Sequence, residues 1–188
     1  MTLFVFAHPM EAETFISKLD LKKENISLNS VYSNSEYLLL VTGEGSSNVI
    51  SKLTNLITIY SNSIFQILNF GIAGRLDPRL KINECYEINS VSMGAKEYTL
   101  DESESGINCI TTNVPVSGES EAQQLIDNGQ AVDMELWSVA DVAASFRIPV
   151  RSVKLISDDA RETISLNEIM KNVKFYSERL FNYFSTHF

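Results

Sequence analysis

Short β-rich segments and longer helical segments alternate along most of this chain, and this alternation constrains its fold more than any other feature. The run Tyr37–Thr42 (YLLLVT) has the length and the apolar character of a buried strand. Ser46–Tyr60 follows it, with apolar residues at helical spacing. Repeated strand–helix alternation favours an α/β fold in which helices cover both faces of a central sheet. We therefore expect a three-layer αβα architecture.

The same patterns predict the remaining elements. Strands are expected at Leu3–Ala7, Ile64–Phe70, Cys85–Val91, Lys96–Leu100, Ile107–Thr112, Ala131–Met134 and Val150–Ile156. Helices are expected to start near Pro9 and after Ser165, and to span Glu119–Asn128 and Leu136–Arg147. An exposed acidic turn is expected at Asp101–Gly106 (DESESG). No repeat, low-complexity block or linker interrupts residues 1–188, so we expect a single domain.

The composition limits the classes of partner. The 188 residues include 24 acidic and 15 basic side chains, which gives a formal charge of −9. So acidic a surface disfavours nucleic acid as a partner, although a single nucleoside could still bind in a local pocket. No segment is long and apolar enough for a signal or membrane helix, so no membrane partner is expected. Cys85 and Cys109 form no metal-binding or C-x-x-C motif, which indicates reduced thiols and a cytoplasmic location.

Glycines and carboxylates gather at one edge of the predicted sheet. In open α/β sheets, ligands bind outside the carboxyl ends of the strands. The segments that follow the predicted strands are Met10–Glu13, Gly43–Gly45, Gly71–Gly74, Met134–Glu135 and Ser157–Asp159. We therefore expect Glu13, Glu135 and Asp158 to converge around one cavity, and the prediction of an enzyme depends on this convergence.

These three carboxylates suit acid–base chemistry. Asp158 ends an apolar strand, and burial raises the pKa of a carboxyl group, so Asp158 is a candidate general acid. Glu13 lies just past the first strand and is a candidate general base, while Glu135 begins a helix. Each acid also has an ordinary alternative, because Asp and Glu are common in the first turn of helices and on solvated surfaces.

Two glycine-containing loops are less specific. Gly43 and Gly45 separate a strand from a helix, without a full dinucleotide fingerprint or a Gly-Lys-Ser/Thr sequence. They suggest either close approach of the backbone to a ligand or merely a tight turn. Asn69–Pro78 (NFGIAGRLDP) holds Gly71 and Gly74 after a strand, where backbone N–H groups could bind an anion, an oxygen atom or a water molecule.

Four stretches resemble, in order, the nucleoside phosphorylase and nucleosidase family, and most closely its methylthioadenosine/S-adenosylhomocysteine nucleosidase branch. They are Pro9–Glu13 (PMEAE), Asn69–Glu84 (NFGIAGRLDPRLKINE), Val132–Val150 (VDMELWSVADVAASFRIPV) and Val153–Ala160 (VKLISDDA). The resemblance covers most of the chain. It implies a phosphorylase/hydrolase-like αβα fold with a central mixed sheet, a homodimer, and no cofactor or metal. It also implies cleavage of the N-ribosidic bond of a purine-type nucleoside, either methylthioadenosine/adenosylhomocysteine-like or futalosine-like.

The resemblance implies catalytic roles for two residues. Asp158 would protonate the purine as it departs, with Ser157 helping to place the Asp158 side chain. Glu13 would position and activate the attacking water. These roles agree with the chemistry, because an oxocarbenium-like transition state needs an acid at the leaving group and a carboxylate near the sugar.

The resemblance also implies a set of substrate-binding residues. Glu135 would hold the ribose hydroxyls, and Met134 would pack under the sugar. Gly71 and Ile72 would contact the substrate, although a small polar residue is usual where Ile72 stands. His8 could contact a ligand at this edge, but a lone loop histidine is more often structural or solvated.

The choice between hydrolysis and phosphorolysis rests on cations, because phosphate binding needs them. The family's phosphorylases carry an arginine before the glycine that matches Gly71, whereas this chain has Asn69 and Phe70, as in the hydrolases. Arg75 and Arg79 leave phosphorolysis open as an alternative. A non-catalytic nucleoside-binding protein is a second alternative, because Glu121 stands where an aromatic residue often stacks on the purine, and loss of that stacking weakens binding.

Overall fold

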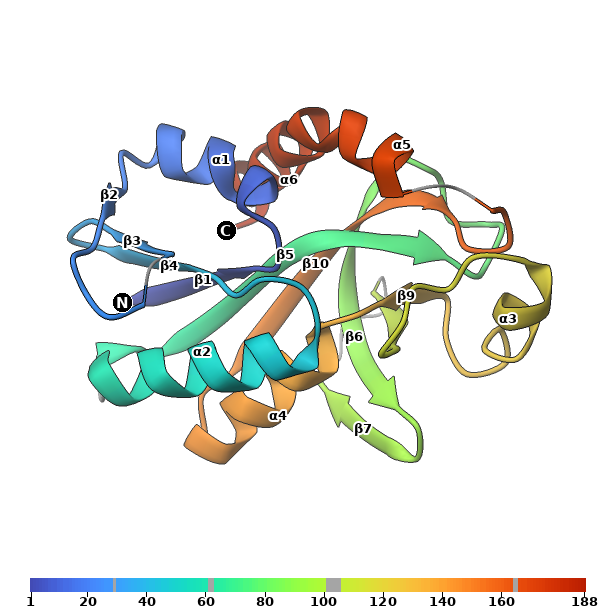
Figure 1. The fold of residues 1–188 in the computed structure, drawn as a ribbon, viewed down its shortest axis with the longest axis horizontal. Helices are drawn as coiled ribbons and strands as arrows, with labels where there is room; N and C mark the ends of the chain where they lie inside the picture. The colour runs from blue at the N-terminus through green and yellow to red at the C-terminus, as the bar shows by residue number, and fades with distance from the viewer. Residues whose placement is uncertain (29, 61–62, 101–105, 164–165) are drawn as a thin grey trace.

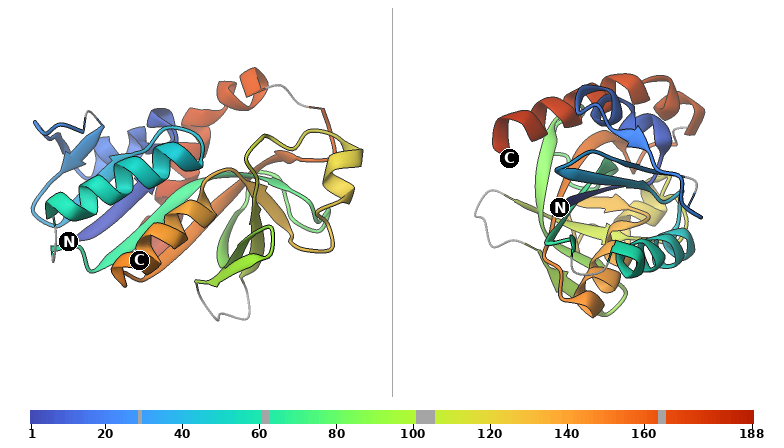
Figure 2. Two further views of the ribbon diagram at one scale, coloured as in Figure 1. Left: turned by 60° about the horizontal axis from the view of Figure 1, so that its bottom comes forward. Right: turned by 90° about the vertical axis from the view of Figure 1, so that its left-hand side faces the viewer.

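The computed structural model describes residues 1–28, 30–60, 63–100, 106–163 and 166–188. Figure 1 shows three layers, with α1, α5 and α6 on one side of a sheet and α2 and α4 on the other. Figure 2 shows the same layers from two further directions. The predicted αβα architecture with a central mixed sheet is therefore confirmed.

All ten strands of the described residues lie in one sheet. They are β1 (Thr2–Phe6), β2 (Lys22–Lys23), β3 (Val31–Ser33), β4 (Tyr37–Val41), β5 (Gln66–Arg75), β6 (Cys85–Met93), β7 (Lys96–Thr99), β8 (Ile107–Thr111), β9 (Ala131–Asp133) and β10 (Val150–Asp159). The order is β10-β6-β8-β9-β5-β1-β4-β3-β2, with β7 beside β6. Because β10 also pairs with β5, the strands β5, β10, β6, β8 and β9 form a closed ring.

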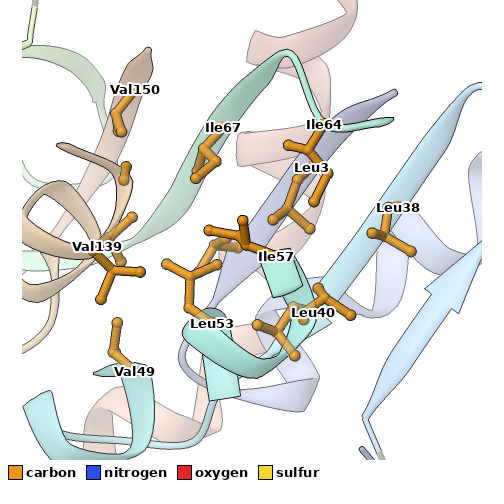
Figure 3. Packing of buried hydrophobic residues seen from close by; sticks show 14 of the residues in the cluster. Leu3, Leu38, Leu40, Val49, Leu53, Ile57, Ile64, Ile67, Val139 and Val150 are labelled. Atoms are coloured by element: carbon orange, nitrogen blue, oxygen red, sulfur yellow. The ribbon is translucent and has the colours of Figure 1, made fainter. Parts of the chain in front are cut away.

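The helices are α1 (Pro9–Lys18), α2 (Ser46–Tyr60), α3 (Glu119–Gln123), α4 (Leu136–Phe146), α5 (Leu166–Lys171) and α6 (Val173–His187). Strand β1 is buried on both faces, so its residues alternate between two cores. Leu3 packs with Leu53 and Ile57 of α2 on one face, as Figure 3 shows. Phe4 faces the opposite core, where its ring contacts Phe15 of α1 edge-on.

Strands β5 and β10 extend further than the sequence predicts. A strand ending at Phe70 was expected because glycine weakens strand interiors. Instead, β5 continues through Gly71 and Gly74 to Arg75, and β10 continues past Ile156 to Asp159. The two strands pair in parallel over this length, and each glycine leaves room for a carboxylate side chain above it.

Three other expectations differ from the structure. Helix α3 ends at Gln123, and the chain beyond it continues in turns rather than as the predicted helix to Asn128. The long final helix is divided into α5 and α6 at Asn172, a residue type that disfavours helix interiors. The short strand β3 and the edge strand β2 beside it were not predicted.

The acidic turn proposed at residues 101–106 lies almost entirely outside the described residues. None of the helices that the structure describes combines the length and the hydropathy that crossing a membrane requires.

Candidate active site

A cavity opens where β1, β4, β9 and β10 end, and the second half of β5 forms its floor. This is the edge at which an α/β sheet places its ligands. The residues that line the cavity are Ala7, His8, Glu11, Glu44, Asn69, Phe70, Gly71, Ile72, Ala73, Gly74, Thr112, Pro115, Val116, Val132, Asp133, Met134, Glu135, Lys154, Ser157, Asp158 and Ile169. Apolar walls with a few charged groups are typical of small-molecule sites.

Six of the seven site residues predicted from the sequence line this cavity. They are Gly71, Ile72, Met134, Glu135, Ser157 and Asp158. They come from β5, from the β9–α4 junction and from β10, so segments that are far apart in the sequence meet here. Of the three acids expected to converge, Glu135 and Asp158 line this cavity.

The placement predicted for Glu13 is wrong. Glu13 is exposed on the outer side of α1 and lines a separate surface depression between α1 and α6. Glu11 lies in the cavity, where Glu13 was expected, and its side chain is only 3% exposed. The reason is helical phase, because two residues turn a helix by about 200°. The catalytic role assigned to Glu13 is therefore corrected.

Glu11 is fixed in the cavity by two backbone hydrogen bonds. The His8 N–H donates to its Oε2 atom over 3.0 Å, which is one half of a capping box at the start of α1. The Ile72 N–H donates to Oε1 over 3.1 Å. Burial raises the pKa of Glu11, although these N–H groups and the nearby Lys154 oppose the shift. Glu11 is thus a rigid carboxyl group with an increased affinity for a proton.

Asp158 lies at the opposite end of the cavity floor. The pairing of β10 with β5 shifts register between Ile156 and Asp158, and such irregularities re-aim side chains. The Ser157 hydroxyl donates a hydrogen bond to the Asp158 carboxylate. Burial raises the pKa of Asp158, and the hydrogen bond from Ser157 partly offsets that increase. This environment suits a group that holds a proton and gives it to a leaving group.

Glu135 is the N-cap residue of α4, but its side chain does not cap that helix. Its Oε1 atom instead accepts a hydrogen bond of 2.7 Å from the Gly45 N–H, and Figure 1 shows the starts of α2 and α4 side by side. Burial raises the pKa of Glu135 to about 7, and the negative charge of Asp133 makes a smaller contribution in the same direction. The alternative of an ordinary capping acid therefore does not hold for Glu135.

A buried ion pair forms part of the cavity lining. The Lys154 Nζ atom is 2.7 Å from Asp133 Oδ2, and the two side chains are 3% and 1% exposed. The Thr111 hydroxyl donates to the other oxygen of Asp133 over 2.6 Å, and the Leu136 N–H also donates to this carboxylate. The Lys154 ammonium group also lowers the pKa of Glu11 and Glu135 against the effect of burial.

The charges of the cavity are mainly negative. Its described lining contains five carboxylates, from Glu11, Glu44, Asp133, Glu135 and Asp158, against one lysine, Lys154, and no arginine. Lys154 is already paired with one of these carboxylates. Such a cavity repels phosphate, because phosphate needs unpaired cations.

The two arginines that left phosphorolysis open lie outside the cavity lining. Arg75 donates two hydrogen bonds, of 2.9 and 3.0 Å, to Asp159. Arg79 is paired with Asp77 over 2.7 Å. Both guanidinium groups therefore serve ion pairs elsewhere in the fold.

Sequence reasoning missed Glu11, Glu44 and Asp133. The signal for Glu11 was present, because Glu11, Ala12 and Phe15 form one buried helical face that excludes Glu13. Glu44 stands between the two glycines that were noted only as a loop. Asp133 pairs with a lysine 21 positions away, and no local pattern predicts that contact.

Other residues singled out in the sequence have structural placements. Glu121 lies on α3, accepts a hydrogen bond from the Ser117 N–H, and does not line the cavity. Pro115 and Val116 line it instead. Cys85 and Cys109 are both free thiols. Within the described ranges, no group of three or more His, Cys, Asp or Glu side chains is arranged to hold a metal ion.

Comparison with known proteins identifies a related family and a shared fold. The family model described as the phosphorylase superfamily matches residues 95–186, which confirms the predicted resemblance. No curated protein sequence matches the chain.

Among solved structures, the chain is similar to a Helicobacter pylori 5′-methylthioadenosine/S-adenosylhomocysteine nucleosidase, with a TM-score of 0.84 and 16% identity over 98% of this chain and 96% of that one. Native futalosine hydrolase of H. pylori gives a TM-score of 0.83 and 17% identity over 98% and 95%. A 5′-methylthioadenosine/S-adenosylhomocysteine nucleosidase from S. pneumoniae gives 0.83 and 15% over 97% and 96%. These likenesses show a shared fold.

Proposed function

We propose that this chain, with the fold of the nucleosidases and a match to the phosphorylase superfamily, hydrolyses the N-ribosidic bond of a purine-type nucleoside. In this proposal residues 1–188 act as one domain. The observation that carries the proposal is the position of two carboxyl groups, the buried Glu11 and the half-buried Asp158, beside Gly71 and Gly74 in one cavity. The solved relatives include nucleosidases for methylthioadenosine/S-adenosylhomocysteine and a futalosine hydrolase, which supports this class of substrate.

Glu11 and Asp158 approach the same strand, β5, at two places. Glu11 Oε1 lies 3.6 Å from the point where a Cβ on Gly71 would stand, and Asp158 Oδ2 lies 3.2 Å from the corresponding point on Gly74. Both acids also line the same cavity, as a general base and a general acid that act on one bound nucleoside must.

In the proposed mechanism, Asp158 gives its proton to the purine as the bond between the base nitrogen and C1′ breaks. Both electrons of that bond leave with the base, and positive charge develops on C1′ and the ring oxygen. The carboxylates of Glu11 and Glu135 stabilise this charge in a site of low dielectric constant. Glu11 takes a proton from the water whose oxygen bonds to C1′, so the products are free base and ribose.

Glu135 and Met134 would hold the sugar. The hydrogen bond from the Gly45 N–H occupies Oε1 of Glu135, which leaves Oε2 to accept from ribose hydroxyls. Met134 follows β9 directly and lines the cavity beside it. Ser157 would keep Asp158 oriented towards the base.

Water is favoured over phosphate as the nucleophile because of the charges of the cavity. Five carboxyl groups, of which Asp158 holds the proton for the leaving group, face one lysine that is already paired, and Arg75 and Arg79 are committed to other carboxylates. A phosphate dianion would therefore enter without an unpaired cation to meet it.

The test is a panel of purine nucleosides incubated with and without phosphate, with free base, ribose and ribose phosphate resolved chromatographically. We expect equal release of base in both conditions, with ribose as the sugar product. Ribose phosphate formed only with phosphate would replace this proposal by phosphorolysis. Binding without any release of base would reduce the chain to a nucleoside-binding protein.

The family resemblance supports a homodimer. The two free thiols support a cytoplasmic location. Light scattering coupled to size exclusion tests the dimer, and a mass of about one chain, 21.1 kDa, would contradict it.

A further inference from the structure

We propose that His8 and Glu44 together bind a hydrogen-bonding group at the 5′ end of the sugar, so that this chain prefers nucleosides with a 5′-hydroxyl or 5′-amino group over 5′-alkylthio nucleosides. This inference rests on the proposed function and specifies the substrate class of the same cavity. Nothing in that function requires either residue, because neither is needed to protonate the base or to activate water.

The fold brings the two residues to the same end of the β1–β4 pair, where both line the cavity. Strands β1 and β4 pair in parallel up to Phe6 and Val41. Two further hydrogen bonds continue the ladder into the loops, from the Thr42 N–H to the Phe6 carbonyl and from the Gly43 N–H to the Ala7 carbonyl. His8 follows Ala7, and Glu44 follows Gly43. Both residues line the cavity.

The backbone of Glu44 is held on both sides. Gly43 and Gly45 adopt φ values of +83° and +85°, which side chains rarely tolerate, so this turn depends on glycine. The Gly45 N–H is bonded to Glu135, and the Asn48 amide donates to the Glu44 carbonyl. In the described part of the chain, the Glu44 carboxylate itself has no hydrogen-bond or ion-pair partner.

His8 offers the complementary group. Its Nδ1 atom accepts a hydrogen bond from the Met10 N–H over 3.2 Å, as the cap of α1. This bond places the proton of the neutral ring on Nε2, so the free nitrogen is a donor. A donor from His8 and an acceptor from Glu44 match a hydroxyl group, which accepts one hydrogen bond and donates another.

The orientation of the sugar leads its 5′ end to these residues. In a nucleoside, the base and the 5′ carbon lie on the same face of the sugar, but they are bonded to C1′ and C4′, the two carbons that flank the ring oxygen. With the base at Asp158, the 5′ carbon points towards the other end of the floor, which begins at Gly71 beside Glu11. His8 lies within hydrogen-bonding distance of Glu11 through its backbone, at this same end.

The test compares adenosine, 5′-amino-5′-deoxyadenosine and 5′-methylthioadenosine, which share one base. We expect the wild-type chain to have a higher kcat/KM for the first two. Glu44→Leu should lower the ratio of kcat/KM for adenosine to that for 5′-methylthioadenosine about tenfold to hundredfold, as expected for loss of a hydrogen bond to a charged group. Glu44→Gln keeps an acceptor, so it should lower the ratio for adenosine less than Glu44→Leu does. Because it removes the negative charge, it should lower the ratio of kcat/KM for 5′-amino-5′-deoxyadenosine to that for 5′-methylthioadenosine more than it lowers the ratio for adenosine.

His8→Asn provides a second variant, because asparagine retains the helix cap but lacks the distant ring donor. It should also lower the preference for adenosine. Glu36→Gln is the matched control, since it removes one exposed acid at the start of β4, the end of that strand away from the cavity. It should leave every ratio unchanged.

Dissociation constants for the same three nucleosides separate the two proposals. If no nucleoside releases base but binding still follows the 5′ preference and its loss in Glu44→Leu, the hydrolytic function fails and this inference stands. If base is released but wild type prefers 5′-methylthioadenosine, or if Glu44→Leu leaves the preference unchanged, the inference is overturned and the hydrolytic function stands.

Discussion

The Lys154 ammonium group lies 2.7 Å from Asp133 Oδ2, and both residues line the cavity with side chains that are almost fully buried. Asp133 is the last residue of β9, directly before Met134 and Glu135. The pair therefore connects β10, which carries Asp158, with the segment that carries Glu135.

We expect Lys154→Met to lower the free energy of unfolding by about 3–5 kcal/mol, because it leaves Asp133 buried without a counter-ion. Urea unfolding at neutral pH measures this. The double variant Asp133→Asn with Lys154→Met should regain part of the loss. The exposed pair of Lys22 and Asp20 is the control, and Lys22→Met should change stability by less than about 1 kcal/mol. Equal losses of stability in Lys154→Met and Lys22→Met would mean that burial of the Lys154–Asp133 pair is unimportant.

Glu11 and Glu13 form a matched pair of acids on one helix. Glu11→Gln should lower kcat by about 10²–10⁴, because amide nitrogen and oxygen cannot take the proton of the attacking water. Glu13→Gln should leave kcat within about twofold of wild type, since exposed surface substitutions have small effects. Steady-state kinetics on the nucleoside found active in the panel decides between them. The reverse pattern would restore Glu13 as the base.

Asp158→Asn should also lower kcat by about 10²–10⁴ while the dissociation constant for the nucleoside changes little, because the asparagine keeps its shape but has no proton to give. Ribosides with a better leaving group, such as p-nitrophenoxide bonded through its oxygen in place of the base, need no protonation and should be hydrolysed with a smaller loss. A uniform loss for all leaving groups would assign Asp158 a role in binding.

Glu135 gives the unfolding equilibrium a pH dependence. Burial raises its pKa to about 7, above its usual 4.5, so between these values the folded chain holds a proton that the unfolded chain has released. Its contribution to stability is complete below about pH 4.5 and is lost as the pH rises through about 7. Glu135→Gln removes this titration. The free energy of unfolding of Glu135→Gln, relative to that of wild type, should rise by about 2–3 kcal/mol from pH 4.5 to pH 8, as measured by urea unfolding. A pH-independent difference would show that Glu135 ionises normally.

Gly74 leaves room for the acid above it. A Cβ on Gly74 would stand 3.2 Å from both Asp158 Oδ2 and the Cβ of Ala160, which is closer than ordinary contacts allow. Gly74→Ala should therefore displace Asp158 and lower kcat by at least about tenfold, since small misplacements of a catalytic group are costly. Gly94→Ala is a control at an open turn, although its positive φ predicts some loss of stability without loss of kcat. Unchanged kcat in Gly74→Ala would show that Asp158 has another productive position.

Much of the fold is encoded locally and was predictable. The helix Ser46–Tyr60 was predicted with its observed bounds, because its buried positions recur at helical spacing. The strands β5 and β10 were predicted too short, since glycine and serine normally end strands. They continue because each strand supplies the other with hydrogen bonds along its whole length.

The sequence by itself determined that strands and helices alternate and that acids follow several strands, because residue spacing and turn residues are local properties. Tertiary structure decided which acids share the cavity. The phase of α1 against the sheet turned Glu11 inward and Glu13 outward, and the pairing of β5 with β10 brought Asp158 above Gly74. The contact of Lys154 with Asp133 likewise depends on how distant segments pack, and packing is a property of the whole chain rather than of any segment.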